Sequence, residues 1–458
     1  MYSKKIAEFV AALSYEDLPD EVIGKSKDCV RDYLGCVLGA YPVDESKMVA
    51  EWVRDMGDRN ESTVLGWGYK TSCRNAAFAN GYFAEVLEAQ DGTSYGNNHP
   101  ASVILPATIA VAEKLNVSGR VFLTALVAGY EVTNRIAASL PPAKSIGFVK
   151  TGVAGALAAS LSVGKILGLN SEQLLNCLGI AGFILPISTR ENMSSSTIKP
   201  ALGGQAAKAG VEAALLAQKG FTGSHEILHG RPPRYLGICN VVCDEPVLDK
   251  LTEGLGHRYT ILDVYFKPYP ACRLTHSAIE ATLDLVLANN ISPETIEKID
   301  VKTFARAANL TGGKYPGPDS NFIDCQFSLP YLLAVVASDR MLEPKQYRRE
   351  KISCPAIQAL AKKVVVSSDE LLTSVYPGKS PAKVTIVLRG GLVFEKQIDQ
   401  PKWQPERGIP RGEYLSKFYA LAGEVLTTER IRKVDQVIND LEALKSISSL
   451  VHETSLGV

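Results

Sequence analysis

Three short segments of this 458-residue sequence gather side chains that can move protons or bind anions. The first, residues 91–100, places an acid, two hydroxyls, a phenol, two amides and the imidazole of His99 between two apolar stretches. Histidine is the most frequent general acid or base in enzymes because its pKa lies near neutrality. From these residues alone, a solvated loop and a binding loop on a rigid scaffold are equally expected.

The second and third segments each contain a lysine beside proline. Residues 194–204 place Lys199 and Pro200 before a small-residue helix, whose N-terminus would attract an anion, although an ordinary surface lysine is the more common case. Residues 266–276 place Lys267 among aromatics and prolines, where burial would depress its pKa and make it a base; a stiff linker with a solvated lysine is the alternative. Cys272 and His276 end this segment and are candidate substrate-binding residues, though a lone helical histidine usually belongs to a core.

Bulk composition excludes several other functions. Lysine plus arginine equals aspartate plus glutamate at 49 each, so no net charge attracts nucleic acid or an anionic membrane. The nine cysteines form no CxxC pair, which argues against a metal site and favours a reducing compartment. No signal-peptide layout and no membrane-length apolar run is present, and no nucleotide, zinc-protease or nucleophile-elbow motif occurs. We therefore expect a cytoplasmic protein without cofactor or metal.

Hydrophobic periodicity predicts a mainly α fold with two parts. A large all-helical domain is expected over residues 1–265, and residues 411–458 complete it with further helices. Residues 266–410 form a smaller α+β lid domain, because short alternating runs typical of strands appear there. The predicted helices are 22–38, 76–89, 101–115, 119–140, 152–167, 171–184, 204–218, 276–288 and 329–337; the predicted strands are 298–304, 363–367, 383–388 and 392–398, the last two as a Gly-Gly hairpin.

In their order, several blocks of the chain resemble the MmgE/PrpD family, which includes 2-methylcitrate dehydratase, cis-aconitate decarboxylase and iminodisuccinate epimerase. The blocks are DYLGC (32–36), ANG (79–81) followed by Asp91, Thr93 and His99-Pro100, GYE (129–131), GFVKTG (147–152), LGL (167–169), Lys199-Pro200, KGFTG (219–223), KPYP (267–270) and FSLPY (327–331). The resemblance implies a helical domain with an inserted α+β lid, a homodimer, no organic cofactor, and small di- or tricarboxylate substrates that exchange a proton beside a carboxylate.

The same resemblance implies the site residues. Thr93, His99, Lys199, Lys267 and Tyr331 match pocket positions of the decarboxylase branch, and Asp91 matches one acid of its Asp-x-Asp-Asp-Thr run. Four positions depart from the family pattern: Ala89 and Gly92 replace acids, and Val149 and Leu202 replace histidines. Lys150, next to Val149, is a candidate substitute that binds substrate.

The leading hypothesis is a lyase or hydratase in a cationic pocket. His99 would be the main acid/base and Tyr331 a proton donor, while Lys199 and Lys267 neutralise carboxylates and stabilise enolate-like charge. Asp91 and Thr93 would orient His99 or the substrate. Two alternatives stay open: an epimerase or isomerase that removes and returns a proton with two opposed groups, and a non-catalytic carboxylate binder.

Overall fold

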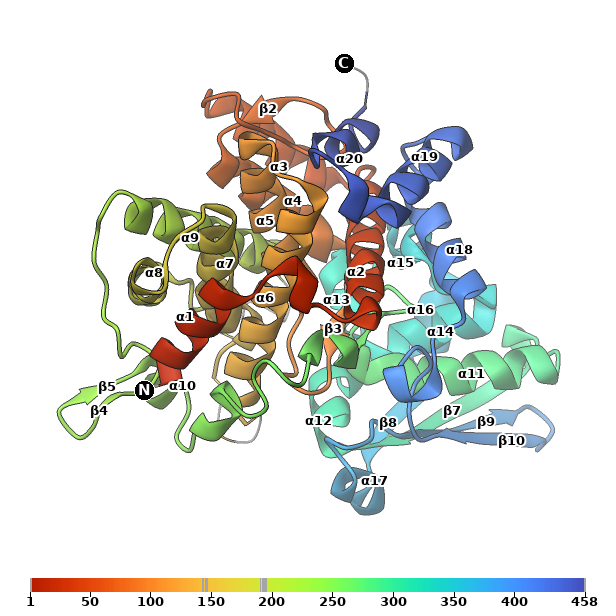
Figure 1. Ribbon diagram of the computed structural model, residues 1–458. Helices are drawn as coiled ribbons and strands as arrows, with labels where there is room; N and C mark the ends of the chain where they lie inside the picture. The colour runs from red at the N-terminus through yellow and green to blue at the C-terminus, as the bar shows by residue number, and fades with distance from the viewer. Residues whose placement is uncertain (1, 142–143, 145–146, 190, 192–195, 457–458) are drawn as a thin grey trace.

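The computed structural model describes residues 2–141, 144, 147–189, 191 and 196–456 of a mainly α protein with one small mixed sheet (Figure 1). The predicted fold class is thus confirmed. Within the described residues, no helix has the length and apolar character needed to cross a membrane. The helices of the larger part are α1 (Tyr2–Ala12), α2 (Asp20–Gly39), α3 (Asp44–Asp55), α4 (Cys73–Val86), α5 (Ala101–Leu115), α6 (Gly119–Ala138), α7 (Lys150–Ile166), α8 (Ser171–Ile184), α9 (Ala201–Gln218) and α10 (Ile238–Val242), with α18 (Arg411–Ala422), α19 (Thr428–Asn439) and α20 (Ser448–Glu453) at the C-terminal end.

Small residues let the central helices of this part pack closely. Helix α7 lies against α5, α6, α8 and α9, and α4 packs on α5 and α9. A Cβ atom built on Gly81 of α4 would lie 2.6 Å from the Cα of Gly204 in α9, so only glycine permits this crossing. Two-residue strands join the loops between these helices: β1 (Ser62–Thr63) with β2 (Lys70–Thr71), β3 (Gly92–Thr93) with β6 (Val264–Tyr265), and β4 (Gly230–Arg231) with β5 (Tyr235–Leu236).

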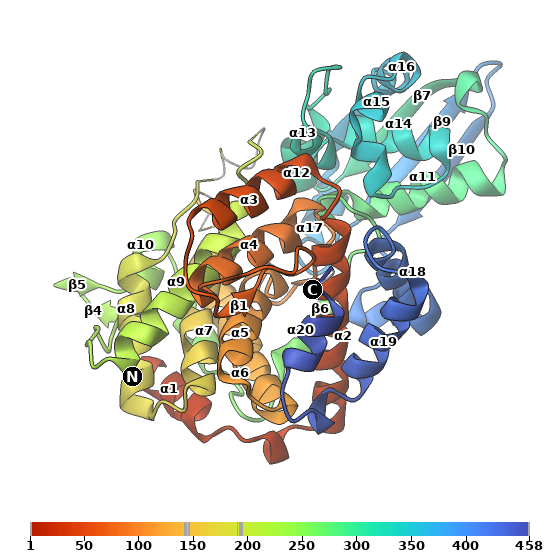
Figure 2. The same ribbon diagram turned by 90° about the horizontal axis from the view of Figure 1, so that it is seen from above.

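The smaller part is built on a four-stranded sheet of order β10-β9-β7-β8. Its strands β7, β9 and β10 lie beside α11 and α14 in Figure 2. Strands β7 (Ile296–Thr303) and β8 (Val364–Ser368) are parallel, whereas β9 (Ala382–Leu388) is antiparallel to both β7 and β10 (Val393–Ile398). Gly390 and Gly391 have φ angles of +98° and +91° in the β9–β10 turn, which explains the Gly-Gly pair in the predicted hairpin. Its helices are α11 (His276–Ala288), α12 (Ala305–Ala307), α13 (Phe322–Gln326), α14 (Leu329–Asp339), α15 (Arg349–Ile352), α16 (Pro355–Ala361) and α17 (Glu370–Ser374).

Two large hydrophobic cores underlie the two parts. One joins residues 6–266 with residues 403–451, because α18 and α19 pack on α2. The other runs from residue 269 to residue 386 and fills the space between α11, α14, α16 and the sheet. The chain segment between the cores, from Phe266 to Tyr269, includes Lys267. The domain limits given by the sequence, 265/266 and 410/411, stay predictions.

One helix ends earlier than its pattern predicts, and the difference matters for the site. The apolar pattern predicts a helix over residues 76–89, but α4 ends at Val86. Glu88 then has a left-handed backbone with φ of +53°. A glutamate rarely adopts this conformation, and such departures concentrate at functional sites.

Candidate active site

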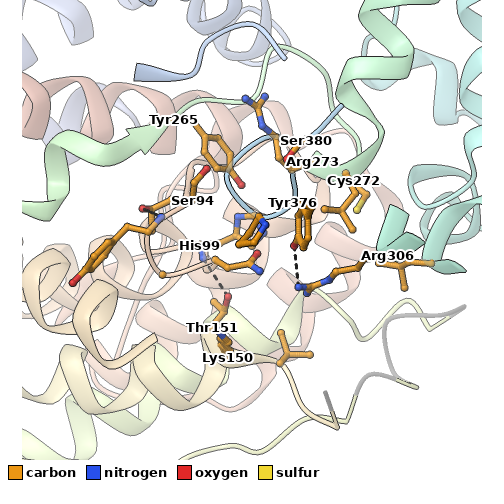
Figure 3. Close-up of a pocket in the computed structure, with 18 of the residues that line it drawn as sticks. Ser94, His99, Lys150, Thr151, Tyr265, Cys272, Arg273, Arg306, Tyr376 and Ser380 are labelled. Atoms are coloured by element: carbon orange, nitrogen blue, oxygen red, sulfur yellow. Dashed lines mark hydrogen bonds between the residues drawn. The ribbon is translucent and has the colours of Figure 1, made fainter. Parts of the chain in front are cut away.

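A cavity of about 210 Å³ lies between the two parts of the molecule, at the level of the first polar segment (Figure 3). The helical part contributes the loop after β3 and the start of α7, and the smaller part contributes the segment before α11, helix α12 with the turn after it, and the loop after α17. A second, inner lobe of about 30 Å³ adjoins it and shares Glu88, His99, Val149 and Thr151 with the main cavity. The antiparallel pairing of β3 with β6 ties these walls together, since it sets Gly92 opposite Tyr265.

His99 is the best-placed proton carrier in this cavity. Its Nδ1 lies 2.6 Å from the carbonyl oxygen of Asp91, and because a carbonyl can only accept, Nδ1 bears the proton. Nε2 therefore has a free lone pair in the neutral ring. Burial, reinforced by the charge of Lys267, lowers the pKa of His99 to about 3. The ring is thus neutral across physiological pH, and its Nε2 is able to accept a proton.

The two predicted lysines do not form the expected cationic pocket, because two buried glutamates neutralise them. Glu88 bridges both: its Oε2 accepts from Lys199 and its Oε1 lies 2.7 Å from the Nζ of Lys267. Glu85 adds a third ion pair, 3.5 Å from the Nζ of Lys199. All four side chains are buried. Lys199 lines the inner lobe, whereas Lys267 lies behind Glu88 and lines neither part of the cavity.

The charge states of this cluster follow from its pairing. Burial opposes the ionisation of Glu88, but the ammonium groups of Lys199 and Lys267 outweigh it and hold its pKa well below the usual range. Burial likewise opposes the charge of Lys199, yet Glu88 and Glu85 raise its pKa. Glu85, with one more distant lysine, has its pKa raised by burial. Glu88 and Lys199 are therefore firmly ionised.

Sequence reasoning missed both glutamates, because they were included in a predicted buried helix. A signal was nevertheless present: Glu85 and Glu88 are the acids of an otherwise apolar, alanine-rich stretch, and buried charges need partners. The family-type acid expected at Ala89 is absent, while the neighbouring Glu88 places a carboxylate on both lysines.

Asp91 and Thr93 support the first segment from behind. The Asp91 carboxyl group accepts from the N–H of Ala101 at 3.0 Å, at the start of α5, and from the hydroxyl of Tyr130 at 2.9 Å. Asp91 does not line the cavity, and it positions His99 through its backbone carbonyl. Thr93 does line the main cavity, and its Oγ1 accepts from the N–H of Tyr95.

The smaller part contributes a different set of polar groups. Cys272, Arg273, Arg306 and Tyr376 line the main cavity, and Figure 3 shows them with His99 and Thr151 around it. The Arg306 guanidinium donates to the Tyr376 hydroxyl at 3.0 Å. Burial raises the pKa of the Cys272 thiol to about 11, so this thiol is no nucleophile at neutral pH.

His276 does not reach the cavity; it holds Arg273. Its Nε2 donates to the carbonyl of Ala271 at 3.0 Å, which leaves Nδ1 to accept from Arg273 at 3.2 Å. The ring is fully buried, and burial together with the charge of Arg273 lowers its pKa far below the ordinary value. Of the alternatives weighed from sequence, the core histidine is the observed placement.

Tyr331 and Lys150 occupy very different places. Tyr331 is fully buried in the core of the smaller part, where its hydroxyl donates to the carbonyl of Gln346, and it does not line the cavity. The predicted proton donor therefore does not line the cavity with His99, because its side chain is directed into the core. Lys150 turns inward, lines the main cavity and donates to the carbonyl of Ala137 at 3.1 Å.

The positions that depart from the family pattern are accommodated locally. Val149 and Leu202 line the inner lobe beside His99 and Lys199. A Cβ atom on Gly92 would lie 2.5 Å from the hydroxyl oxygen of Tyr265 and 3.0 Å from the Nδ1 of His99, so Tyr265 excludes any acidic side chain there. Residues 194 and 195, at the start of the second polar segment, lie outside the described residues.

The fold and the cavity define a class of protein: a helical part and a smaller α+β part with a cavity between them, which is lined by a neutral histidine, by Lys199 in its glutamate cluster and by two arginines. Family comparison agrees, since the MmgE/PrpD N-terminal domain matches residues 4–248 and the MmgE/PrpD C-terminal domain matches residues 269–442. The chain belongs to the MmgE/PrpD family.

Named relatives give the same result. The chain is 26% identical to cis-aconitate decarboxylase of Aspergillus terreus, over 98% of this chain and 95% of the relative. It is 25% identical to the Mus musculus enzyme of that name and 24% identical to the Homo sapiens one, over 98% of this chain and 92% and 93% of the relatives. The predicted family is confirmed, and so is the predicted lyase-type enzyme, since these relatives are decarboxylases.

Proposed function

We propose that this protein is a cofactor-independent lyase that removes or delivers a proton beside a carboxylate of a small di- or tricarboxylate. The observation that supports it most directly is the ring of His99: a neutral imidazole in the cavity wall, held by its Nδ1–H bond to the carbonyl of Asp91, whose Nε2 keeps a lone pair for a proton. The arginines of the smaller part supply the cations that bind a substrate carboxylate. The decarboxylase relatives support the class of reaction.

In this mechanism Nε2 of His99 takes a proton from the carbon beside the carboxylate. The released electron pair forms a double bond and expels a group on the next carbon, which is a hydroxide in a dehydration. The protonated His99, which lines both parts of the cavity, then delivers this proton to the hydroxide and releases it as water. A neutral base favours reactions that start with proton removal, so dehydration is the preferred lyase reaction.

The test is a mass-spectrometric screen of purified protein against a pool of small carboxylates, followed by His99→Gln on the substrate found. Glutamine keeps a hydrogen-bonding group but cannot accept the proton, so kcat should fall about 10²- to 10⁴-fold. Because the pKa of His99 is about 3, the wild-type kcat/KM should show no histidine limb between pH 5 and 8. Full turnover by the variant would contradict the proposal, whereas binding without turnover by the wild type would favour a non-catalytic binder.

An epimerase or isomerase is the second candidate, and one observation favours it. Tyr376 and His99 line the same cavity from the two parts of the molecule, as the two-group mechanism requires (Figure 3). Solvent deuterium in recovered substrate, without loss of water or carbon dioxide, would favour this reaction. Loss of that exchange in Tyr376→Phe, with His99 intact, would identify the second group.

Two further properties remain proposals. The homodimer rests on the family resemblance, and light scattering of the purified protein would test it. The cytoplasmic location rests on composition and cysteine usage, and fractionation of cells that produce the protein would test it.

A further inference from the structure

The cations at one end of the cavity are paired with acidic side chains, whereas those at the other end are not paired with acidic side chains of the described residues. At the lysine end, Lys199 and Lys267 are matched by Glu85 and Glu88, so this buried cluster has no formal net charge. At the arginine end, neither Arg273 nor Arg306 has an acidic partner at salt-bridge distance among the residues that the structure describes. The hydrogen bonds of Arg273 go to His276 and to the carbonyl of Lys402, and that of Arg306 goes to Tyr376.

One donor at the arginine end also has no acceptor. The Nε–H group of Arg273 is buried, and within the described part of the chain it has no hydrogen-bond partner. A buried donor without an acceptor costs free energy, and an anion in the adjoining cavity would remove that cost. Tyr265 lies under the guanidinium at 4.3 Å and holds its plane in place. Burial lowers the pKa of Arg273 to about 10, which still leaves it charged at neutral pH.

We infer that the substrate binds in one direction, with its carboxylates at Arg273 and Arg306 and an uncharged polar group at the inner lobe, and that Glu88 sets this preference. This inference rests on the proposed function and narrows its substrate class. Glu88 lines both parts of the cavity and presents a negative charge wherever a second anionic group would approach Lys199. The inner lobe, at about 30 Å³, has room for one or two water-sized groups such as a hydroxyl.

Glu88 is the element that decides between two substrate classes. Without it the lysine cluster would have a net charge of +1 and would attract an additional carboxylate. With it, an anion at that end meets the carboxylate of Glu88 and an ammonium group of Lys199 that is already paired with two glutamates. The left-handed backbone of Glu88 is what brings its carboxylate between the lysines instead of continuing α4.

Glutarate and tricarballylate test the inference, because tricarballylate is glutarate with one more carboxylate on its central carbon. Calorimetry at pH 8 gives the ratio of their dissociation constants for each protein. The wild type should bind tricarballylate no more tightly than glutarate. Glu88→Gln should shift the ratio about tenfold towards tricarballylate, and Lys267→Met about tenfold towards glutarate, the size of one charge interaction at about 10 Å and an effective dielectric constant of about 20.

The double variant Glu88→Gln/Lys267→Met restores a neutral cluster and should return the ratio to within about threefold of the wild type. Glu424→Gln, an exposed acid near Arg348, is the matched control and should leave the ratio unchanged. Equal ratios in the wild type and both single variants would overturn the inference. A wild type that strongly prefers tricarballylate would also overturn it, and this measurement does not depend on whether the variants fold. No binding of either ligand by any of the proteins would instead contradict the proposed carboxylate site itself.

Discussion

The lysine end and the arginine end of the cavity contain the same number of cations but differ in the partners of those cations. The lysines come from segments flanking the helical core, are buried, and each contacts Glu88. The arginines come from the smaller part, and their contacts are a histidine, a phenol and a backbone carbonyl. The difference teaches that the residue type shows which side chains are charged, but that the partners of each side chain decide whether its charge is available to a substrate.

This contrast assigns different roles to the two ends. A buried, fully paired cluster is rigid, and removing one member leaves another charge unpaired. A cation paired only with neutral groups can bind an anion without first breaking an ion pair. Changes at the lysine end should therefore act mainly on stability and specificity, and changes at the arginine end mainly on affinity.

The largest expected effect is on stability at the lysine end. Lys267→Met should lower the free energy of unfolding by about 3–5 kcal/mol, because Glu88 loses the partner on its Oε1 while it stays buried. Urea unfolding followed by circular dichroism measures the change. Lys396→Met is the matched control: its ion pair with Asp284 is partly exposed, so the loss should be under about 1 kcal/mol. Equal losses in the two variants would show that Lys267 is not part of a tightly coupled cluster.

The second prediction concerns Asp91, a buried carboxyl group that, unlike Glu88, forms no ion pair within the described part of the chain. Burial raises the pKa of Asp91 to about 7, so the folded state retains its proton over a range where the unfolded chain, with a pKa near 3.9, has lost it. The stability that Asp91 contributes is thus fully present below about pH 4 and is lost as pH rises to about 7. Asp91→Asn is always neutral and lacks this dependence.

Between pH 4 and pH 7 the wild type should therefore lose up to about 4 kcal/mol of unfolding free energy relative to Asp91→Asn, at about 1.4 kcal/mol per pKa unit. Urea unfolding at several pH values measures it, with the partly exposed Asp284→Asn as control. A difference that stays constant over this range would mean that Asp91 is ionised in the folded protein.

The fold and part of the cavity lining could be predicted from the sequence, whereas the contrast between the two ends could not, for identifiable reasons. His99, Lys199 and Thr93 lie at the cavity as the ordered blocks predict, and the helices around them follow their apolar periodicity. Glu88 could not be predicted, because a single left-handed residue ends α4 against a continuing apolar pattern.

The arginine end was missed for a different reason. Arg306 and Tyr376 lie in short helical and loop segments far apart in the sequence, and only the packing of α12 against α17 brings them together. Tyr331 shows the converse: its FSLPY motif occurs at the position along the chain that the family pattern predicts, but its side chain is buried in the core of the smaller part. Order along the chain thus predicts the family better than the direction of each side chain.

The smallest expected effect is at the arginine end. Arg306→Gln should weaken glutarate binding about tenfold, because one charge-assisted contact to a carboxylate is lost. The free energy of unfolding should change by less than about 1 kcal/mol, since the hydrogen bond that this half-buried arginine forms within the described part of the chain goes to the neutral Tyr376. Calorimetry and urea unfolding give the two numbers from one preparation. Arg349→Gln, an exposed arginine paired with Asp319, is the matched control and should alter neither. If Arg306→Gln instead lost stability and kept its affinity for glutarate, the two ends of the cavity would have the same role, and the division between a structural lysine end and a binding arginine end would be wrong.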